Sequence, residues 1–231
     1  MRYVISLVLT LAGCASPSAI NNAGANVVVI YSEATCANPN TGKAMSTGFF
    51  TDSKTIVTAA HLYEGKPPKD AHLAAFDRQG RCHNAIVAAA SANLDLMKLT
   101  VRVMAPTEGA ALAAANPESG KHVFVLSLSP PRMKKFHPIK TLAFSGMNRE
   151  DAYQTVNPWI APHFISERVT KPGDSGAPVV NERGEVVGMT LGGHTDCKLP
   201  ACKLINMPNK YPKHNVYVGV PAIRRFLRDN P

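Results

Sequence analysis

Short apolar segments, each followed by turn-forming residues, recur along most of the chain. Runs rich in Val, Ile, Thr and Phe are separated by Asn, Pro, Gly, Asp and Lys, a pattern typical of β-strands. In the first half the runs cover residues 27–31, 47–50, 55–58, 72–76, 85–88 and 96–101. In the second half they cover residues 123–128, 139–145, 154–156, 164–166, 178–180, 186–191 and 216–220. So many short strands predict an all-β fold, either a barrel or a sandwich.

Three segments depart from this pattern. Residues 105–120 are rich in Ala, Glu, Pro and Gly, and they predict a crossing between two halves of the chain. Near the C-terminus, Pro221 precedes Ile223, Phe226 and Leu227 at helical spacing, which predicts a short amphipathic helix. Residues 16–26 are small and polar, as in a tether, so we expect the folded body to begin after them.

The N-terminus carries an export signal. Arg2 is followed by an apolar run over residues 3–11, which is too short to span a bilayer but long enough for the core of a signal peptide. The run ends in Leu11-Ala12-Gly13-Cys14, which resembles the bacterial lipobox, whose cysteine receives a diacylglycerol anchor. A plain signal peptide cleaved near Ala15 or Ala19, with Cys14 lost, is the alternative.

The lipobox resemblance places the protein on the bacterial cell envelope, because acyl chains on one cysteine hold a protein on a membrane without a transmembrane helix. Ala15, not an aspartate, follows Cys14, and this implies the outer membrane in a cell with two membranes. The net charge of +9 fits proximity to anionic lipid or cell wall. No nucleic-acid-recognition motif is visible, so we expect no nucleic-acid partner, and we expect a monomer.

The cysteines predict disulfides. If Cys14 is acylated, four cysteines remain in an oxidising compartment, and an even number there favours disulfide pairing. Three pairings are possible, and we favour the local one, Cys36–Cys82 with Cys197–Cys202. A metal site is the alternative, but no CxxC pair or close His–Cys spacing supports it, so we expect no metal.

The most informative segment is Lys171-Pro172-Gly173-Asp174-Ser175-Gly176-Ala177-Pro178. A serine between glycines sits on a tight turn where the backbone can approach a substrate closely. The N–H groups of Gly173 and Ser175 could then stabilise a developing oxyanion. Taken alone, Gly-Asp-Ser-Gly also fits an ordinary surface turn.

Two further segments complete the chemistry. His61 follows an apolar strand and two alanines; a histidine buried in the core for structural reasons is the alternative. Asp95 lies inside an apolar, strand-like segment, where an unpaired carboxylate would be costly. An imidazole N–H is a suitable partner, because the carboxylate fixes the histidine tautomer and stabilises the imidazolium that forms when the histidine takes a serine proton.

Together, these segments resemble chymotrypsin-like serine proteases, with His61, Asp95 and Ser175 in that family's order. The resemblance covers roughly residues 26–230 and looks closer to the bacterial glutamyl-endopeptidase-like branch than to animal trypsins. It implies two antiparallel Greek-key β-barrels and a short C-terminal helix. The expected units are a signal peptide at 1–13, a tether at 14–25, a first barrel at 26–112 with His61 and Asp95, and a second barrel at 113–231 with Ser175.

The same resemblance implies a specificity pocket. The substrate-binding residues that it assigns are Val169, Thr170, Thr190, Gly192 and Gly193. Thr170 matches the pocket threonine of glutamate-specific relatives, but Thr190 stands where they have a histidine. Val169 stands where trypsin-like enzymes have an aspartate. This pocket would suit small or medium uncharged side chains, although Lys171 or His194 could attract an acidic one.

The sequence therefore predicts an exported, lipid-anchored serine endopeptidase that hydrolyses proteins or peptides through an acyl-enzyme and needs no cofactor. A catalytically silent lipoprotein that uses the protease scaffold for binding is one alternative. An esterase of the same mechanism is another. In relatives activated from a zymogen, an aspartate at the position of Asp174 pairs with a new N-terminal amine, and the sequence leaves open whether activation occurs here.

Overall fold

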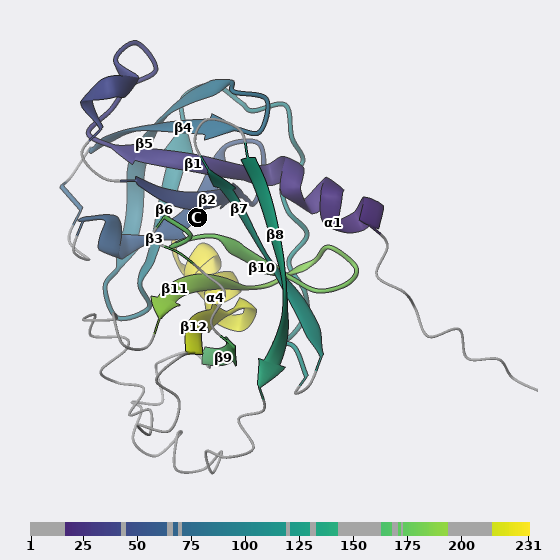
Figure 1. Cartoon of the computed structure of the whole chain (residues 1–231). Coiled ribbons are helices and arrows are strands. Elements are labelled where there is room, and N and C mark those ends of the chain that lie inside the picture. The colour runs from purple at the N-terminus through teal and green to yellow at the C-terminus, as the bar shows by residue number, and fades with distance from the viewer. Residues whose placement is uncertain are drawn as a thin grey trace, which may run out of the picture.

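Two antiparallel β-barrels, a short helix before the first strand and a short C-terminal helix make up the described part of the protein (Figure 1). The computed structural model describes residues 17–42, 45–63, 67–68, 71–118, 121–129, 133–142, 163–167, 171, 173–193 and 214–231. The predicted fold class, two Greek-key barrels with a terminal helix, is confirmed. Among the described residues, no helix has the length and apolar character needed to cross a membrane.

The first barrel has the strand order β1-β2-β3-β6-β5-β4 and is closed by pairing of β1 with β4. Its strands are β1 (Val27–Ser32), β2 (Met45–Phe50), β3 (Thr55–Ala59), β4 (His72–Asp77), β5 (Cys82–Ser91) and β6 (Leu96–Val101). Short 3-10 turns, η2 (Pro39–Thr41) and η3 (Ala60–Tyr63), follow β1 and β3. Because side chains alternate along a strand, Val28 and Ile30 fill the barrel while Val27 and Val29 pack outside it.

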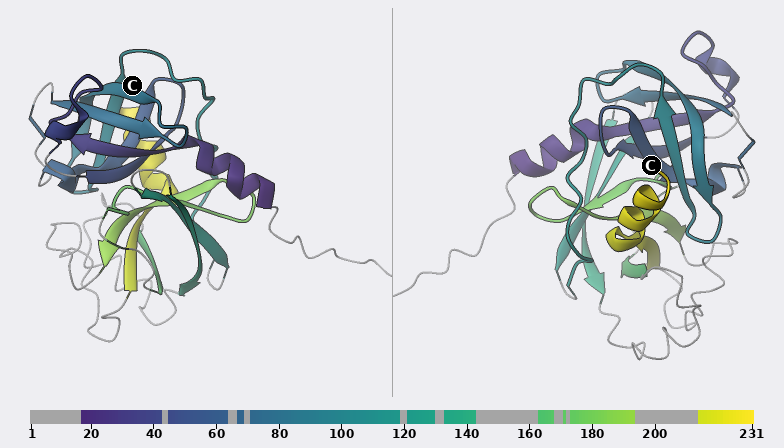
Figure 2. Two further views of the ribbon diagram at one scale, coloured as in Figure 1. Left: turned by 45° about the horizontal axis from the view of Figure 1, so that its top comes forward. Right: turned by 180° about the vertical axis from the view of Figure 1, so that it is seen from behind.

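The second barrel has the order β10-β11-β12-β9-β8-β7. Its strands are β7 (His122–Ser129), β8 (Met133–Leu142), β9 (His163–Glu167), β10 (Pro178–Val180), β11 (Val186–Gly193) and β12 (His214–Gly219). Phe164 and Tyr217 stack inside it with ring centroids 4.8 Å apart. Helix α4 (Val220–Asp229) follows β12 directly, and seen from behind it crosses the junction of the two barrels (Figure 2).

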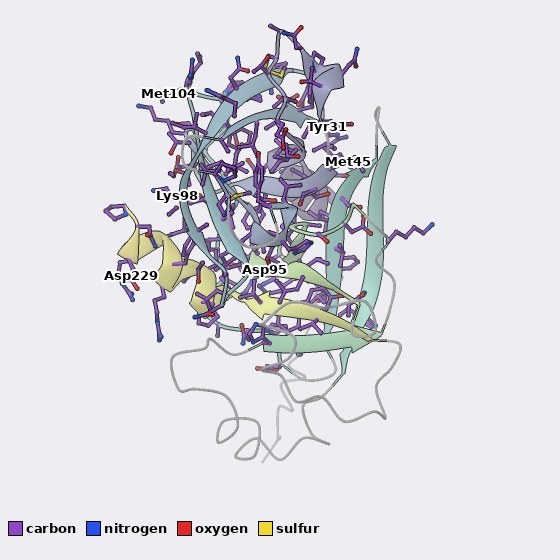
Figure 3. All side chains as sticks on the ribbon, turned by 90° about the vertical axis from the view of Figure 1, so that its left-hand side faces the viewer. Tyr31, Met45, Asp95, Lys98, Met104 and Asp229 are labelled. Carbon is purple, nitrogen blue, oxygen red and sulfur yellow. A yellow bond between two sulfur atoms is a disulfide. The ribbon has the colours of Figure 1, made fainter. Side chains whose placement is uncertain are left out.

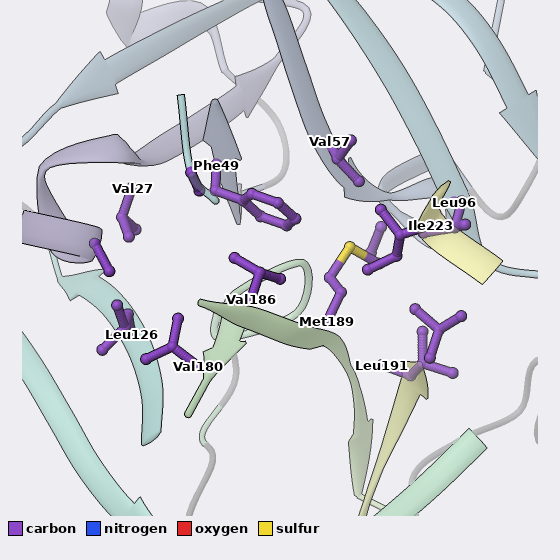
Figure 4. Packing of buried hydrophobic residues seen from close by; sticks show 14 of the residues in the cluster. Val27, Phe49, Val57, Leu96, Leu126, Val180, Val186, Met189, Leu191 and Ile223 are labelled. Atoms are coloured by element: carbon purple, nitrogen blue, oxygen red, sulfur yellow. The ribbon is translucent and has the colours of Figure 1, made fainter. Parts of the chain in front are cut away.

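A shared apolar core joins the barrels. Val27, Phe49 and Val57 of the first barrel meet side chains of the second barrel and of α4 (Figure 4). The partners that Figure 4 labels are Leu126, Val180, Val186, Met189, Leu191 and Ile223. Strands that face this core are buried on both sides, which explains why Val27 to Ile30 is apolar without interruption.

Most predicted strands are confirmed, and the differences concern pairing and length. Strand β8 covers Met133–Leu142, whereas the sequence predicted a strand at 139–145. The polar first half of β8 is extended because it pairs with β7 residue by residue, so cross-strand context overrides its weak strand propensity. The strand predicted at 154–156 lies outside the described residues.

The segment predicted to cross between the two halves of the chain contacts both barrels. The Ala110 N–H donates to the Phe50 carbonyl of the first barrel, and Leu112 forms an isolated β-bridge with Val186 of the second.

The tether predicted for residues 14–25 is wrong over residues 17–25. Helix α1 (Pro17–Ala23) and the 3-10 turn η1 (Gly24–Asn26) lead directly into β1 (Figure 1). Ile20 and Ala23 are one helical turn apart and bury their side chains in the core between the barrels. Gly184 of the β10–β11 turn packs against the Ala19 backbone. Burial of the Ile20 and Ala23 side chains therefore stabilises a helix in a segment whose composition is typical of a linker.

The predicted Cys36–Cys82 disulfide is present, with the two Cα atoms 5.6 Å apart. It joins the loop after β1 to the first residue of β5. The Cys36 amide also donates to the Asn84 side chain, so this loop is held on β5 by two links. The predicted Cys197–Cys202 pair and the lipidation site Cys14 lie outside the described residues.

A buried histidine predicts acid sensitivity of the fold. Burial lowers the pKa of His163 to about 4, and its Nε2 atom has no hydrogen-bond partner among the described residues. Between that value and about 6.5, the ordinary histidine pKa, the unfolded chain binds a proton that the native chain does not. The contribution of His163 to the free energy of unfolding should therefore be fully present above about pH 6.5. It should fall by about 3 kcal/mol as the pH drops to about 4. Urea unfolding at several pH values measures this, and in His163→Leu this part of the acid loss should disappear; an unchanged loss would contradict the assignment.

Candidate active site

His61 and Asp95 meet at one end of the first barrel. His61 lies in η3, directly after β3, and Asp95 precedes β6, the strand that pairs with β3. His61 Nδ1 and Asp95 Oδ2 are 2.7 Å apart, and the His61 backbone N–H donates to Asp95 Oδ1 at 2.8 Å. The Ala60 N–H donates to the Asp95 carbonyl at 3.2 Å. One hydrogen bond therefore joins the imidazole to the carboxylate, and two more hold the backbone of the His61 segment against Asp95.

The sequence placed Asp95 in an apolar, strand-like segment, immediately before the strand predicted at 96–101, and β6 has these bounds in the structure. Asp95 ends a turn, with a φ of 53°, and β6 begins at the next residue. The left-handed region is unfavourable for most side chains, but aspartate tolerates it better than β-branched or bulky residues do. The side chain is 1 % exposed, while that of His61 is 25 % exposed. The carboxylate is thus removed from water, and the imidazole that it holds remains accessible.

Ser175 lies on a tight turn of the second barrel. Gly173 and Gly176 flank it with φ values of 94° and 81°, which glycine adopts without strain. The Gly176 N–H donates to Thr190 O of β11 at 2.8 Å. Across the part of the chain that the structure describes, no backbone carbonyl accepts the N–H of Gly173 or Ser175. These are the two amides that the sequence assigned to an oxyanion hole.

Asp174, inside the same turn, is bonded locally. Its Oδ2 atom accepts the Lys171 N–H at 2.7 Å, and its own N–H donates to the Lys171 carbonyl at 3.0 Å. Its side chain is buried. The carboxylate therefore stabilises the turn from within, through a backbone amide four positions before Ser175.

Contacts between the barrels bring this turn to the histidine segment. The Thr47 N–H of β2 donates to the Ser175 carbonyl at 2.8 Å. Gly176 lies so close to β2 and β3 that a Cβ there would be 2.0 Å from Thr47 O and 3.0 Å from Ala59 N. Ala59 is two residues before His61, and Asp95 lies at the level where the barrels meet (Figure 3). The junction of the barrels thus brings together His61, Asp95 and Ser175. Among the described atoms, His61 and Ser175 form no direct hydrogen bond. In proteases without substrate, such catalytic hydrogen bonds are often long and shorten when substrate binds.

The close approach of Gly176 yields a testable difference between two glycines. Gly176→Ala should destabilise the fold by about 2–3 kcal/mol more than Gly80→Ala, because the new Cβ would clash with β2. Gly80 has a nearly identical φ of 79°, but a Cβ there would meet no described atom within 4 Å. Gly80→Ala therefore isolates the backbone strain of about 1 kcal/mol. Urea unfolding measures both variants, and equal losses would show that the close contact is unimportant.

The pocket residues are only partly within the described part of the chain. Thr190 is buried beside the Ser175 turn, with its N–H bonded to Ala177 O at 2.9 Å. Its hydroxyl is also buried and has no hydrogen-bond partner among the residues that the structure describes. Gly192 and Gly193 pair with β12 after an irregularity in the β11 register. Val169 and Thr170 lie outside the described residues.

Sequence reasoning missed the contribution of β2. Ser46 Oγ donates to the Ser175 carbonyl, and Thr47 Oγ1 donates to the Gly173 carbonyl, each at 2.7 Å. These partners are 129 and 126 residues apart in the chain. The only local signal was a pair of hydroxyl residues at the start of a strand whose other side chains are mostly apolar.

Comparison with known proteins agrees with this geometry. A family model described as the trypsin-like peptidase domain matches residues 46–189, more than half of the chain. No curated protein matches in sequence. Among solved structures, the Rv3671c protease from M. tuberculosis in its active form is similar, with a TM-score of 0.64 and 19% identity, covering 94% of this chain and 88% of that one. The serine endoprotease from Yersinia pestis has a TM-score of 0.65 and 15% identity, covering 91% of this chain and 64% of that one. At these identities the two structures show a shared fold.

Proposed function

The chain belongs to the trypsin-like peptidase family, and from that premise we propose that it is a serine endopeptidase with Ser175 as nucleophile, His61 as general base and Asp95 as the group that orients His61. The observation that carries the proposal is the 2.7 Å contact between His61 Nδ1 and Asp95 Oδ2. With Nδ1 bonded to the carboxylate, Nε2 is the nitrogen left for proton transfer.

The proposed reaction has two halves. Ser175 Oγ attacks the scissile carbonyl carbon while its proton passes to His61 Nε2, and the oxyanion accepts hydrogen bonds from the Gly173 and Ser175 amides. His61 then donates its proton to the leaving amine, the C–N bond breaks, and an ester to Ser175 remains. A water molecule, deprotonated by His61, hydrolyses that ester and restores Ser175. Asp95 stabilises the imidazolium at each stage, and no cofactor takes part.

For specificity, we propose a pocket for small or medium uncharged side chains, lined by Thr190, Gly192 and Gly193 together with Val169 and Thr170. The position of Thr190 supports this, because its side chain is buried beside the Ser175 turn and carries no charge. A specificity like that of the glutamyl-endopeptidase branch would require a basic group elsewhere, such as Lys171 or His194. Cleavage of a peptide library with mass-spectrometric readout would distinguish uncharged from acidic preference.

We also propose that the protein is exported and anchored by lipid on Cys14. Only two residues separate Cys14 from the first residue of α1, so a lipid there would hold α1 within about 10 Å of the membrane surface. Metabolic labelling with an alkyne fatty acid tests this: label and membrane association should both be lost in Cys14→Ser. A protein that carries no label and begins after Ala15 or Ala19 would instead favour a plain signal peptide.

Turnover of an unfolded protein separates the proposed function from its alternatives. Fluorescently labelled casein should be cleaved by the purified protein and not by Ser175→Ala, with a thioester or nitrophenyl ester assayed in parallel. Ester hydrolysis without casein cleavage would favour the esterase. Absence of both activities in correctly folded protein would favour a binding module built on the protease scaffold.

A further inference from the structure

Two consecutive residues of β2 hold the Ser175 turn through three hydrogen bonds, which we call the β2 clamp. The Ser175 carbonyl accepts from the Thr47 N–H at 2.8 Å and from Ser46 Oγ at 2.7 Å. The Gly173 carbonyl accepts from Thr47 Oγ1 at 2.7 Å. Ser46 is 2 % exposed and Thr47 is fully buried, so water does not compete for these donors.

The clamp is supported by the strand that leads to His61. Thr58 of β3 donates its hydroxyl to Thr47 O at 2.7 Å, and its Oγ1 is 3.2 Å from Ser46 Oγ. Gly48 and Thr58 are paired in the β2–β3 ladder. The donors to the Ser175 turn and the segment that presents His61 therefore belong to one hydrogen-bonded unit.

Hydrogen bonds to the Gly173 and Ser175 carbonyls restrict the peptide that lies between them. The Gly173 carbonyl belongs to the peptide that joins Gly173 to Asp174, and the Ser175 carbonyl to the peptide that joins Ser175 to Gly176. The Ser175 N–H belongs to the peptide between these two. Because peptide units are planar, holding the outer two restricts the rotation of the middle one. Of the three clamp bonds, the bond donated by the Thr47 hydroxyl is accepted by the Gly173 carbonyl, and the other two are accepted by the Ser175 carbonyl.

We propose that Thr47 is a positioning residue for hydrolysis: its hydroxyl holds the Gly173–Ser175 turn so that the amides of Gly173 and Ser175 are directed at the developing oxyanion. This inference rests on the proposed function of Ser175. A donor that aligns the oxyanion hole should act on the transition state more than on substrate binding, because the negative charge develops only as the reaction proceeds.

The test compares Thr47→Val with Thr47→Ser in the full-length protein. Valine keeps the shape of threonine and the N–H bond to Ser175, but removes the donor to Gly173. We expect kcat to fall roughly 10- to 100-fold while KM changes less than about twofold. Affinity for a peptide boronate, which forms a tetrahedral anion on the serine, should fall in parallel with kcat. Thr47→Ser, which restores a hydroxyl, should recover most of both.

Thr107→Val is the matched control for a merely structural role. Thr107 is a partly buried threonine in the crossing segment, where its hydroxyl bonds Asn26 and the Gly109 N–H, away from the Ser175 turn. It should lower the unfolding temperature and leave kcat and boronate affinity unchanged. If Thr47→Val does not fold, Ser46→Ala removes another clamp bond and should give a smaller parallel loss of kcat and boronate affinity.

Several outcomes would overturn the inference. One is a Thr47→Val variant that loses stability but keeps its kcat and boronate affinity, as expected for Thr107→Val. Another is a kcat loss without a matching loss of boronate affinity, or one that serine does not rescue. Failure of the proposed function looks different, because the wild-type protein would then neither turn over substrate nor bind the boronate, and the role of Thr47 would fall with it.

Discussion

Ser175→Ala and His61→Ala should each lower kcat for peptide hydrolysis by about 10⁶-fold, and the double variant should be no slower than either single one. The two side chains act in one proton transfer, so removing either abolishes the activated nucleophile. The remaining turnover would come from the Gly173 and Ser175 amides and from substrate binding. Steady-state kinetics on a sensitive fluorogenic peptide, with the enzyme concentration taken from absorbance and a detection range of more than about six decades, measures these losses.

How the two kcat losses combine in the double variant is as informative as the size of each loss. If the losses of the two single variants multiplied in the double variant, Ser175 and His61 would be acting in separate steps. His83→Ala is a suitable control, because His83 also has a carboxylate partner, Asp77, at 3.3 Å, yet lies in β5 beside the buried Phe50 ring. Its kcat should remain within about twofold of wild type, and a loss comparable to that of His61→Ala would contradict the assignment.

Asp95→Asn should lower kcat by about 10⁴-fold while the fold is retained. Asparagine keeps the size of the side chain, and its oxygen can still accept the His61 backbone N–H that Asp95 Oδ1 accepts. Its NH₂ group would then face His61 Nδ1 and select the tautomer that carries the proton on Nε2. That tautomer cannot take the proton of Ser175. Stopped assays at high enzyme concentration, with circular dichroism to confirm the fold, measure the effect.

Asp77→Asn is the matched control for Asp95→Asn. Asp77 is also a buried carboxylate of the first barrel, and it accepts hydrogen bonds from Arg81 Nε at 2.6 Å and from the backbone of Gln79 and Arg81. The neighbouring Arg81 and His83 hold the pKa of Asp77 below its usual value, against the effect of burial. Its replacement should lower stability and leave kcat nearly intact. A fall in kcat as large as that of Asp95→Asn would point to general disruption of the barrel.

The strands and the pairing of His61 with Asp95 were predictable because their signals are local. Short apolar runs bounded by turn-forming residues identified Leu96–Val101 and Pro178–Val180 with their observed bounds. The Asp95 carboxylate inside an apolar segment required a partner, and a histidine after an apolar strand was the suitable one. Both inferences follow from the cost of burying an unpaired charge.

The features that sequence reasoning missed depend on distant contacts. Helix α1 is folded by Ile20 and Ala23 against a core that both barrels form, and its composition alone resembles a linker. The first half of β8 is a strand because β7 pairs with it. The roles of Ser46 and Thr47 arise from partners more than 120 residues away. The left-handed turn at Asp95 likewise depends on the three bonds that tie it to Ala60 and His61.

The most direct test of an activated serine is labelling of the mature protein with a fluorophosphonate probe, followed by intact mass and peptide mapping. The expected result is one adduct per chain, located on Ser175, absent in Ser175→Ala and formed far more slowly in His61→Ala. Protein that is folded and retains the Cys36–Cys82 disulfide but gains no adduct, or gains it on a different residue, would contradict the account.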